Sequence, residues 1–320
     1  MFKKLHIFLG ATVADAASRP LHWVYDEKKL MSYIRNKKNI TFFKENRCPF
    51  YSIKTGEVSG YNAVGQVMFK TLTNSKNKNN IITDFKKNIV KNFGPSSKYW
   101  KNLKLRKKYK KIKWTAAMKG PWIHQNILET IKNIRLKKAT TGGTKVNESD
   151  GYCAALPYFL FNNSENKLKK IIRTVANGKI SEQFALAKLK IIDLAAENNE
   201  DPINSFIRLN SKSNYFKNVI VNIKKVKKLK NKSHNIVVKK FGKACSYPGT
   251  FNGSIHAIIT SKNYKSAIIK TIKAGGCNCS RANFVGAYFA AKNGLKDIPK
   301  DWIKKTNPAK NILNYIPSVI

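Results

Sequence analysis

The chain has 320 residues, of which 42% are hydrophobic and 25% charged, enough for one large globular domain or two ordinary ones. No apolar run reaches the ~18–20 residues that a membrane-spanning helix needs, and the 17 Gly and 10 Pro follow no period, so membrane-spanning and collagen-like chains are excluded. Five Cys, an odd number in a long chain, favour a reducing compartment over a disulfide scaffold, and we expect a cytoplasmic location.

The net charge is extreme, because 62 Lys and Arg stand against 17 Asp and Glu, which leaves +45. Such a charge is typical of proteins that bind nucleic acid or an anionic surface. Only 8 of the basic residues are Arg, however, and the chain has 35 Asn, a composition that codon bias also produces. Because dedicated phosphate binders prefer Arg, we favour codon bias and expect nucleic acid to bind only non-specifically, through charge.

The first predicted element is a buried helix over residues 3–18, ended by Pro20. The same stretch loosely resembles a secretory signal peptide. His6 interrupts its apolar part, and Asp15 stands where such signals have small neutral residues. We therefore favour the buried helix.

Helical spacing of apolar residues continues along most of the chain. Asp201 and Pro202 are a start signal, Ser181 followed by Glu182 is a second one, and Gly294 marks an end. Further helices are predicted over residues 63–72, 82–92, 122–136, 152–161, 166–176, 181–197, 202–209, 254–261, 264–274 and 280–292.

Residues 218–243 break this pattern, because β-branched stretches are separated there by a lysine-rich link. We interpret the segment as an exposed, variable connection in which short strands are possible. Basic runs at residues 106–113, 224–232 and 239–243 could bind phosphates, with Trp100, Tyr109 and Trp114 stacking near the first, but we favour solvated faces. Few strands and no repeat are expected, so the prediction is a mostly α protein of one compact domain.

Four short motifs stand out. Residues 10–16 read GATVADA, residues 21–26 read LHWVYD, residues 273–281 read KAGGCNCSR, and residues 294–302 contain G-L-x-x-I-P-x-x-W. Together they resemble the ADP-ribosylglycohydrolase superfamily, whose corresponding motifs are G-A-x-x-G-D-A, G-G-D-T-D-T and G-L-x-x-I-P-x-x-W. Residues 244–251 (ACSYPGTF) and 277–281 (CNCSR) resemble one branch, that of the J-crystallins and selenoprotein J.

The resemblance covers about residues 3–305. It implies an all-α, orthogonally packed single domain spanning the chain, with a cleft in which two Mg²⁺ ions help to hydrolyse a glycosidic bond to ADP-ribose. Mg²⁺ prefers oxygen ligands, usually carboxylates, and paired ions polarise the substrate and activate water.

The family's acidic metal clusters fall on residues 60–63 (GYNA) and 277–280 (CNCS), which hold no acid. No acid lies between Glu57 and Asp84, or from Pro202 through Lys296, so no shift of the alignment restores them. We therefore assign no cofactor, although the family would lead us to expect Mg²⁺. The degenerate metal positions are Tyr61, Asn62, Ala63, Cys277, Cys279 and Ser280.

Three acids remain as catalytic candidates. Asp15 carries over from the family's G-D pair, Asp150 stands where the family has an N-G pair that touches the ribose-phosphate of the substrate, and Glu148 is close by in sequence. Asp15 is equally well explained as a buried acid that caps or hydrogen-bonds a helix, and Asp150 as a helix cap. For Glu148 we favour a surface position.

Gly275 and Gly276 are predicted to expose N–H groups at a helix start, which is a ready site for a diphosphate and needs no metal. The other predicted ligand-binding residues, some of which could serve packing alone, are Gly151, His22, Asn62, Cys277, Asn278, Cys279 and Ser280.

The pair Cys277 and Cys279 has three interpretations. A Zn²⁺ site is weakly supported, because such a site has three or four ligands and only Cys245 is an obvious addition. A reactive thiol is more plausible, since a helix N-terminus and nearby Lys lower the pKa of a thiol. Packing residues without chemistry are the interpretation we favour.

Two functions are consistent with these residues. The first is a hydrolase of an ADP-ribosyl or related glycosidic bond in which the metal ligands are replaced. The alternative is an inactive protein that binds ADP-ribose or a nucleotide, or serves as a crystallin-like structural protein, since J-crystallins show that the scaffold can serve without chemistry. In both, the partner is an ADP-ribose-type small molecule, and no membrane is involved.

Overall fold

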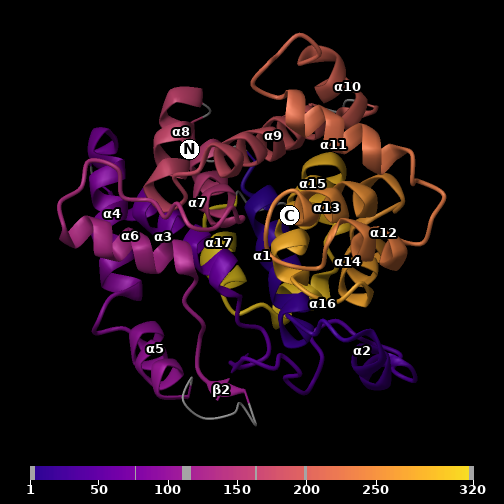
Figure 1. Cartoon of the computed structure of the whole chain (residues 1–320), viewed down its shortest axis with the longest axis horizontal. Helices are drawn as coiled ribbons and strands as arrows, with labels where there is room; N and C mark the ends of the chain where they lie inside the picture. Colours follow the sequence, from indigo (N-terminus) through magenta and orange to yellow (C-terminus); the bar gives the residue numbers. More distant parts are fainter. Residues whose placement is uncertain (1–3, 76, 110–116, 163, 198–199, 317–320) are drawn as a thin grey trace.

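The computed structural model describes residues 4–75, 77–109, 117–162, 164–197 and 200–316. Helices dominate these residues, which confirms the all-α fold class (Figure 1). The α-helices are α1 (His6–Ser18), α2 (Glu27–Ile34), α3 (Gly60–Asn74), α4 (Ile81–Phe93), α5 (Lys98–Tyr109), α6 (Gln125–Arg135), α7 (Asp150–Phe159), α8 (Glu165–Val175), α9 (Lys179–Ala196), α10 (Pro202–Leu209), α11 (Lys217–Lys227), α12 (His234–Phe241), α13 (Gly249–Ile259), α14 (Tyr264–Lys273), α15 (Asn278–Asn293), α16 (Lys300–Lys305) and α17 (Ala309–Leu313).

The centre of the molecule is the pair α1 and α15, whose residues are buried almost throughout. Gly10 of α1 faces Gly286 of α15, and the absence of side chains lets the two backbones approach closely. Helices α9, α13 and α14 pack on α15, and α7 joins α9 to α3. The apolar residues of all these helices form one continuous core.

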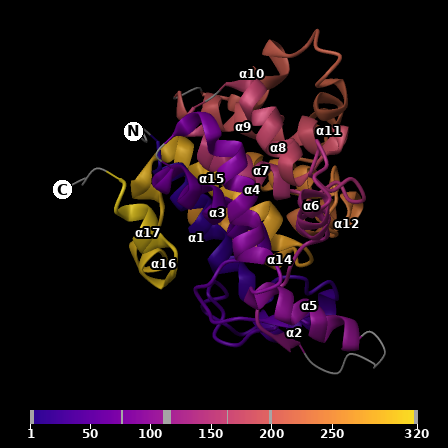
Figure 2. The same cartoon turned by 90° about the vertical axis from the view of Figure 1, so that its left-hand side faces the viewer.

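The periphery has two ends (Figure 1 and Figure 2). Helices α10 and α11 lie at one end, and α2 and α5 lie at the other. Near α5, the short strands β1 (Tyr51–Ser52) and β2 (Met118–Lys119) pair in parallel, with Tyr51 opposite Met118. No helix among the described residues is both long and apolar enough to span a bilayer.

Several predicted helix ends are confirmed by their local chemistry. Asp201 caps α10, because its carboxylate accepts the N–H of Asn204, and Pro202 is the first helical residue. Gly294 ends α15 with φ at 76°, a backbone conformation that other residues adopt only at a cost. Pro20 follows the end of α1 in a 3₁₀ turn.

The interpretation of residues 218–243 as an exposed connection with strands is wrong, because α11 and α12 occupy most of the segment. Val219, Ile223 and Val226 lie on one face of α11 and are fully buried, so the β-branched residues follow a helical period that the lysines between them obscured. Ser181 is not a cap either, since α9 begins at Lys179 after Gly178 and the Ser181 hydroxyl donates to Asn147 Oδ1 at 3.3 Å.

Besides α11 and α12, four helices were not predicted, namely α2, α5, α16 and α17. α2 had a readable start, since the Asp26 carboxylate accepts the N–H of Lys29. Of the basic run at residues 106–113, residues 110–113 lie outside the described part of the chain, as does the predicted stacking residue Trp114.

Candidate functional site

The side chain of Asn62 sits in a chain of amide hydrogen bonds near the start of α3. Asn62 Nδ2 donates to Asn283 Oδ1 at 2.9 Å, and Asn62 Oδ1 accepts from Gln66 Nε2 at 2.8 Å. Asn283 Nδ2 in turn donates to Asp15 Oδ2 at 2.6 Å. Asn62 and Asn283 are buried, so both polar groups of the Asn62 carboxamide are satisfied within the protein.

Asp15 is fully buried at the inner end of this chain. Its carboxylate also accepts the N–H and the hydroxyl of Ser59, both at 2.6 Å, and Ser59 is the residue that caps α3. Burial raises the pKa of Asp15 to about 6, although the bonds from Ser59 and Asn283 favour the charged form. This geometry matches the structural alternative, in which Asp15 helps to cap a helix.

Tyr61, which is fully buried, contacts Glu148, which is half-buried. The Tyr61 hydroxyl donates to Glu148 Oε2 at 2.9 Å, and the Tyr61 ring lies 4.0 Å from the ring of His124. Burial and the neighbouring Asp150 charge raise the pKa of Glu148 to about 7. Glu148 is therefore a partly buried acid that titrates near neutrality rather than a surface residue.

Asp150 lies behind Glu148, fully buried in the first turn of α7. His124 Nδ1 lies 2.7 Å from Asp150 Oδ1, and Asn126 Nδ2 donates to Asp150 Oδ2 at 3.0 Å. Burial alone would lower the pKa of His124, but the charge and hydrogen bond of Asp150 and the charge of Glu148 raise it above the ordinary value. Gly151 is buried beside it, against Ile172 of α8.

Sequence reasoning missed His124 and Asn126 as members of this site. It also missed Tyr51, whose hydroxyl lies 3.1 Å from His22 Nδ1. All three residues lie outside the motifs that carry the family resemblance. A signal for His124 did exist, since it precedes α6 and is one of only five His in the chain.

The expectation that Gly275 and Gly276 expose N–H groups is wrong. Both glycines are buried and have positive φ angles of 67° and 61°. The Gly276 N–H donates to the Val24 carbonyl and the Cys277 N–H to the Lys243 carbonyl. Because neighbouring loops take these donors, they do not form an open anion site.

The cysteines of the site differ in their surroundings. Cys277 caps α15 without a side-chain bond to it, Cys279 lies in the first turn, and both are fully buried. The Cys277 sulfur lies 3.5 Å from His22 Nε2 and 3.7 Å from the Tyr61 hydroxyl. Burial raises the pKa of Cys279 well above that of an ordinary thiol, so the first turn does not favour a thiolate there.

His22 is fully buried and forms part of an aromatic wall. Its ring stacks on Trp23 at 4.3 Å, and Trp23 meets Trp122 at 5.4 Å. Trp23 has φ at 63°, an unusual and strained conformation for a bulky residue, and its N–H donates to the Gly276 carbonyl.

The residues at the degenerate metal positions do not fit a pair of Mg²⁺ ions. The Asn62 carboxamide is hydrogen-bonded to other side chains of the protein, and the Ser280 hydroxyl donates to the Cys277 carbonyl at 2.9 Å. Tyr61 and Ala63 have no carboxylate oxygen to offer a cation. Asn278 Nδ2 donates to the carbonyls of Ser18 and Leu21. Without carboxylates, these positions supply too little negative charge for two divalent ions.

A second group of side chains has the residue types that bind a cation. Ligand atoms of His124, Glu148 and Asp150 all lie within 4.8 Å of one another. His124 Nδ1 and Asp150 Oδ1 already contact each other at 2.7 Å, so these two residues form a buried pair with Glu148 beside it.

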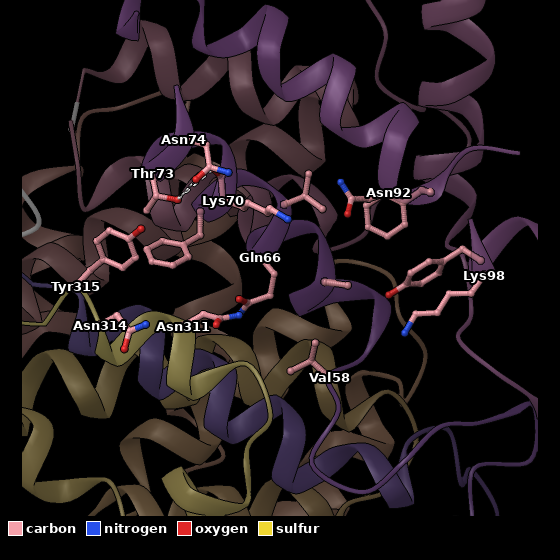
Figure 3. A pocket seen from close by; sticks show the side chains of 15 residues that line it. Val58, Gln66, Lys70, Thr73, Asn74, Asn92, Lys98, Asn311, Asn314 and Tyr315 are labelled. Atoms are coloured by element: carbon pink, nitrogen blue, oxygen red, sulfur yellow. Dashed lines mark hydrogen bonds between the residues drawn. The ribbon is translucent and has the colours of Figure 1, made fainter. Parts of the chain in front are cut away.

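A separate cavity of about 540 Å³ lies along another face of α3 (Figure 3). In Figure 3, Gln66 of α3 points toward Asn311 of α17, with Tyr315 on one side of the cavity and Asn92 and Lys98 on the other. Gln66 connects the cavity to the amide chain, since its Nε2 donates to Asn62 and to Thr12 Oγ1.

Comparison with known proteins gives concordant matches. The family model described as ADP-ribosylglycohydrolase matches residues 5–317. Crystallin J1A of Tripedalia cystophora is 29% identical over 317 residues, covering 96% of this chain and 92% of the relative. Crystallin J1B of the same organism is 27% identical, covering 98% and 94%.

A solved structure titled "ADP-ribosylglycohydrolase-related protein complex" superposes with a TM-score of 0.60, covering 97% of this chain and 94% of the other. At 12% identity this likeness shows the fold alone. With the family match, it confirms the resemblance that the motifs indicated.

Proposed function

Because the chain belongs to the ADP-ribosylglycohydrolase family, we propose that it is a non-hydrolytic member, a binding or structural protein that has lost magnesium-dependent cleavage. Its ligand is of the ADP-ribose type, and its location is cytoplasmic, in keeping with the free cysteines among the described residues. Both relatives are named crystallins, which supports a structural or binding role over hydrolysis.

The observation that carries this proposal is the closed chain Asn62–Asn283–Asp15–Ser59. The resemblance implies an acidic metal ligand at this position. Here Asn62 instead donates to Asn283, which donates to Asp15. The nearest carboxylate, Asp15, is fully buried and accepts three hydrogen bonds from two residues. A Mg²⁺ ion would have to break this network without gaining a charged ligand beyond Asp15.

We expect no saturable Mg²⁺ binding up to millimolar concentration at pH 7. Calorimetric titration with Mg²⁺ measures this directly, and titration with ADP-ribose with and without Mg²⁺ should give the same affinity. Glu148→Gln is the matched control, because removing this acid should leave the absence of Mg²⁺ binding unchanged. Micromolar Mg²⁺ affinity, or Mg²⁺-dependent cleavage of ADP-ribosyl-arginine, would contradict the proposal.

A second function, metal-independent hydrolysis, is favoured by one specific feature. Glu148 is half-buried, hydrogen-bonded to Tyr61, and has a pKa raised by burial to about 7, which suits a general acid. If it acts in this way, turnover without Mg²⁺ should fall as the pH rises through 7, as Glu148 loses its proton.

Glu148→Gln should then lower that turnover by roughly 10²–10⁴-fold while leaving ADP-ribose affinity nearly unchanged. Absence of turnover in the unmodified protein, measured with chelator present between pH 5 and 8, removes this second function and leaves the non-hydrolytic one.

A further inference from the structure

Two sulfurs from distant parts of the chain meet beside the aromatic wall. The Cys277 N–H donates to the Lys243 carbonyl at 2.9 Å, which brings the loop before α13 against the start of α15. Cys245 lies two residues farther along this loop, and its sulfur accepts the Nε1–H of Trp23 at 3.1 Å. The Trp23 ring stacks on His22, which contacts the Cys277 sulfur. The backbone contact therefore closes the 31 residues between the two cysteines into a loop, with both cysteines at its closure.

Cys277 has the surroundings of a nucleophilic thiol. His22 Nε2 lies 3.5 Å from its sulfur, and His22 Nδ1 is held by the Tyr51 hydroxyl at 3.1 Å. This is the arrangement of nucleophile, base and orienting group that activates thiols. Burial would raise the pKa of Cys277, but hydrogen bonds from Cys245 and His22 hold it well below the ordinary thiol value.

A buried cation near Cys277 also favours the thiolate. Arg281 is fully buried in α15, and its Nε and Nη1 have no hydrogen-bond partner among the described residues. Its Nη2 donates to the Gly275 carbonyl. Since no acid occurs from Pro202 through Lys296, a thiolate at Cys277 supplies negative charge that this part of the chain otherwise lacks.

Cys245 is the complementary partner. It is the only cysteine of the described residues that is not fully buried, and Trp23 Nε1 donates to its sulfur at 3.1 Å. The hydrogen bond to Cys277 and burial raise the pKa of Cys245, so it remains a protonated thiol at neutral pH. Cys245 is therefore the more accessible sulfur of the pair.

We propose that Cys277 and Cys245 form a peroxide-reactive dithiol site that closes to an intramolecular disulfide. The Cys277 thiolate attacks one oxygen of a hydroperoxide, the O–O bond breaks, and the departing oxygen takes a proton from solvent, leaving Cys277 as a sulfenic acid. The Cys245 sulfur then attacks the Cys277 sulfur, the S–O bond breaks, and water leaves with the thiol proton. The two thiols are oxidised and the peroxide is reduced.

The test uses the full chain, reduced and then treated with equimolar hydrogen peroxide at pH 7. After quenching with a maleimide under denaturing conditions and digestion without reductant, mass spectrometry should find one linked pair of peptides, containing Cys245 and Cys277. Cys48, Cys153 and Cys279 should carry maleimide. We expect Cys277 to be oxidised at least about 10-fold faster than Cys279.

Two variants separate the steps. Cys245→Ser should stop at the sulfenic acid, which dimedone captures at Cys277, because the resolving thiol is gone. Cys279→Ser, a change two residues away in the same turn, should form the disulfide like the unmodified protein. Preferential oxidation of Cys48, Cys153 or Cys279, or no oxidation of Cys277 in any form, would overturn the proposal. The outcome does not depend on whether the protein binds or cleaves ADP-ribose.

Discussion

We expect Gly286→Ala to destabilise the protein by about 3 kcal/mol or more, a large effect for one methyl group. A Cβ atom at Gly286 would lie 2.5 Å from the Ala14 Cβ and 2.5 Å from the Gly10 carbonyl oxygen, both on the facing helix α1. Both distances are far inside van der Waals contact, and one of the partners is rigid backbone. The central helices α1 and α15 would have to separate along a buried seam.

Urea denaturation followed by far-UV circular dichroism measures this change. Helix propensity alone predicts the opposite sign, because Ala is better than Gly in a helix by roughly 1 kcal/mol. Ala14→Gly added to Gly286→Ala should recover part of the loss, since it removes one of the two clashes. Unchanged or increased stability of Gly286→Ala would show that α1 and α15 do not pack this closely.

Lys188→Met should stabilise the protein at pH 6 by about 3 kcal/mol or more. Lys188 is fully buried in α9, where its ammonium donates to Ser149 Oγ at 3.1 Å and lies 4.7 Å from the ring centres of Tyr152 and Tyr247. No ion pair to it occurs among the described residues. Burial lowers its pKa from 10.5 to about 7, so a charged Lys188 costs the folded state roughly 5 kcal/mol at low pH.

The pH dependence follows from the same pKa. Between pH 7 and 10.5 the unfolded chain keeps the Lys188 proton while the folded chain has lost it, so stability rises with pH by up to roughly 1.4 kcal/mol per pH unit. Below pH 7 both states hold the proton and the full penalty applies. The advantage of Lys188→Met should therefore shrink from pH 6 to pH 9.5.

Urea midpoints at pH 6, 8 and 9.5 test this expectation. Lys190→Met is the matched control, because Lys190 lies two residues along α9, is 40% exposed and pairs with Glu165. Its replacement should change stability by less than about 1 kcal/mol at every pH. If Lys188→Met instead lowers the stability, and lowers it equally at pH 6 and pH 9.5, the prediction is wrong. The aromatic neighbours of the ammonium would then stabilise it.

Much of the fold was readable from the sequence, because the signals are local. Asp201 and Pro202 start α10, and Gly294 ends α15, through contacts within a few residues. The family motifs and the absence of acids from Pro202 through Lys296 are also properties of the chain itself. They indicate the family, which the family match confirms, and they predict that the acidic metal ligands are replaced.

The tertiary structure decided which side chains meet and which donors are free. Tyr61, Glu148, His22, Cys245 and Cys277 come from five separate segments, and only the packing of α1, α3, α7 and α15 brings them within hydrogen-bond reach. The Gly276 N–H was expected to be open, but the Val24 carbonyl accepts it, and the Lys243 carbonyl accepts the neighbouring Cys277 N–H. Such pairings join residues more than 200 positions apart, or distant loops, so no local pattern encodes them: burial demands a partner, and the fold alone determines which one is near.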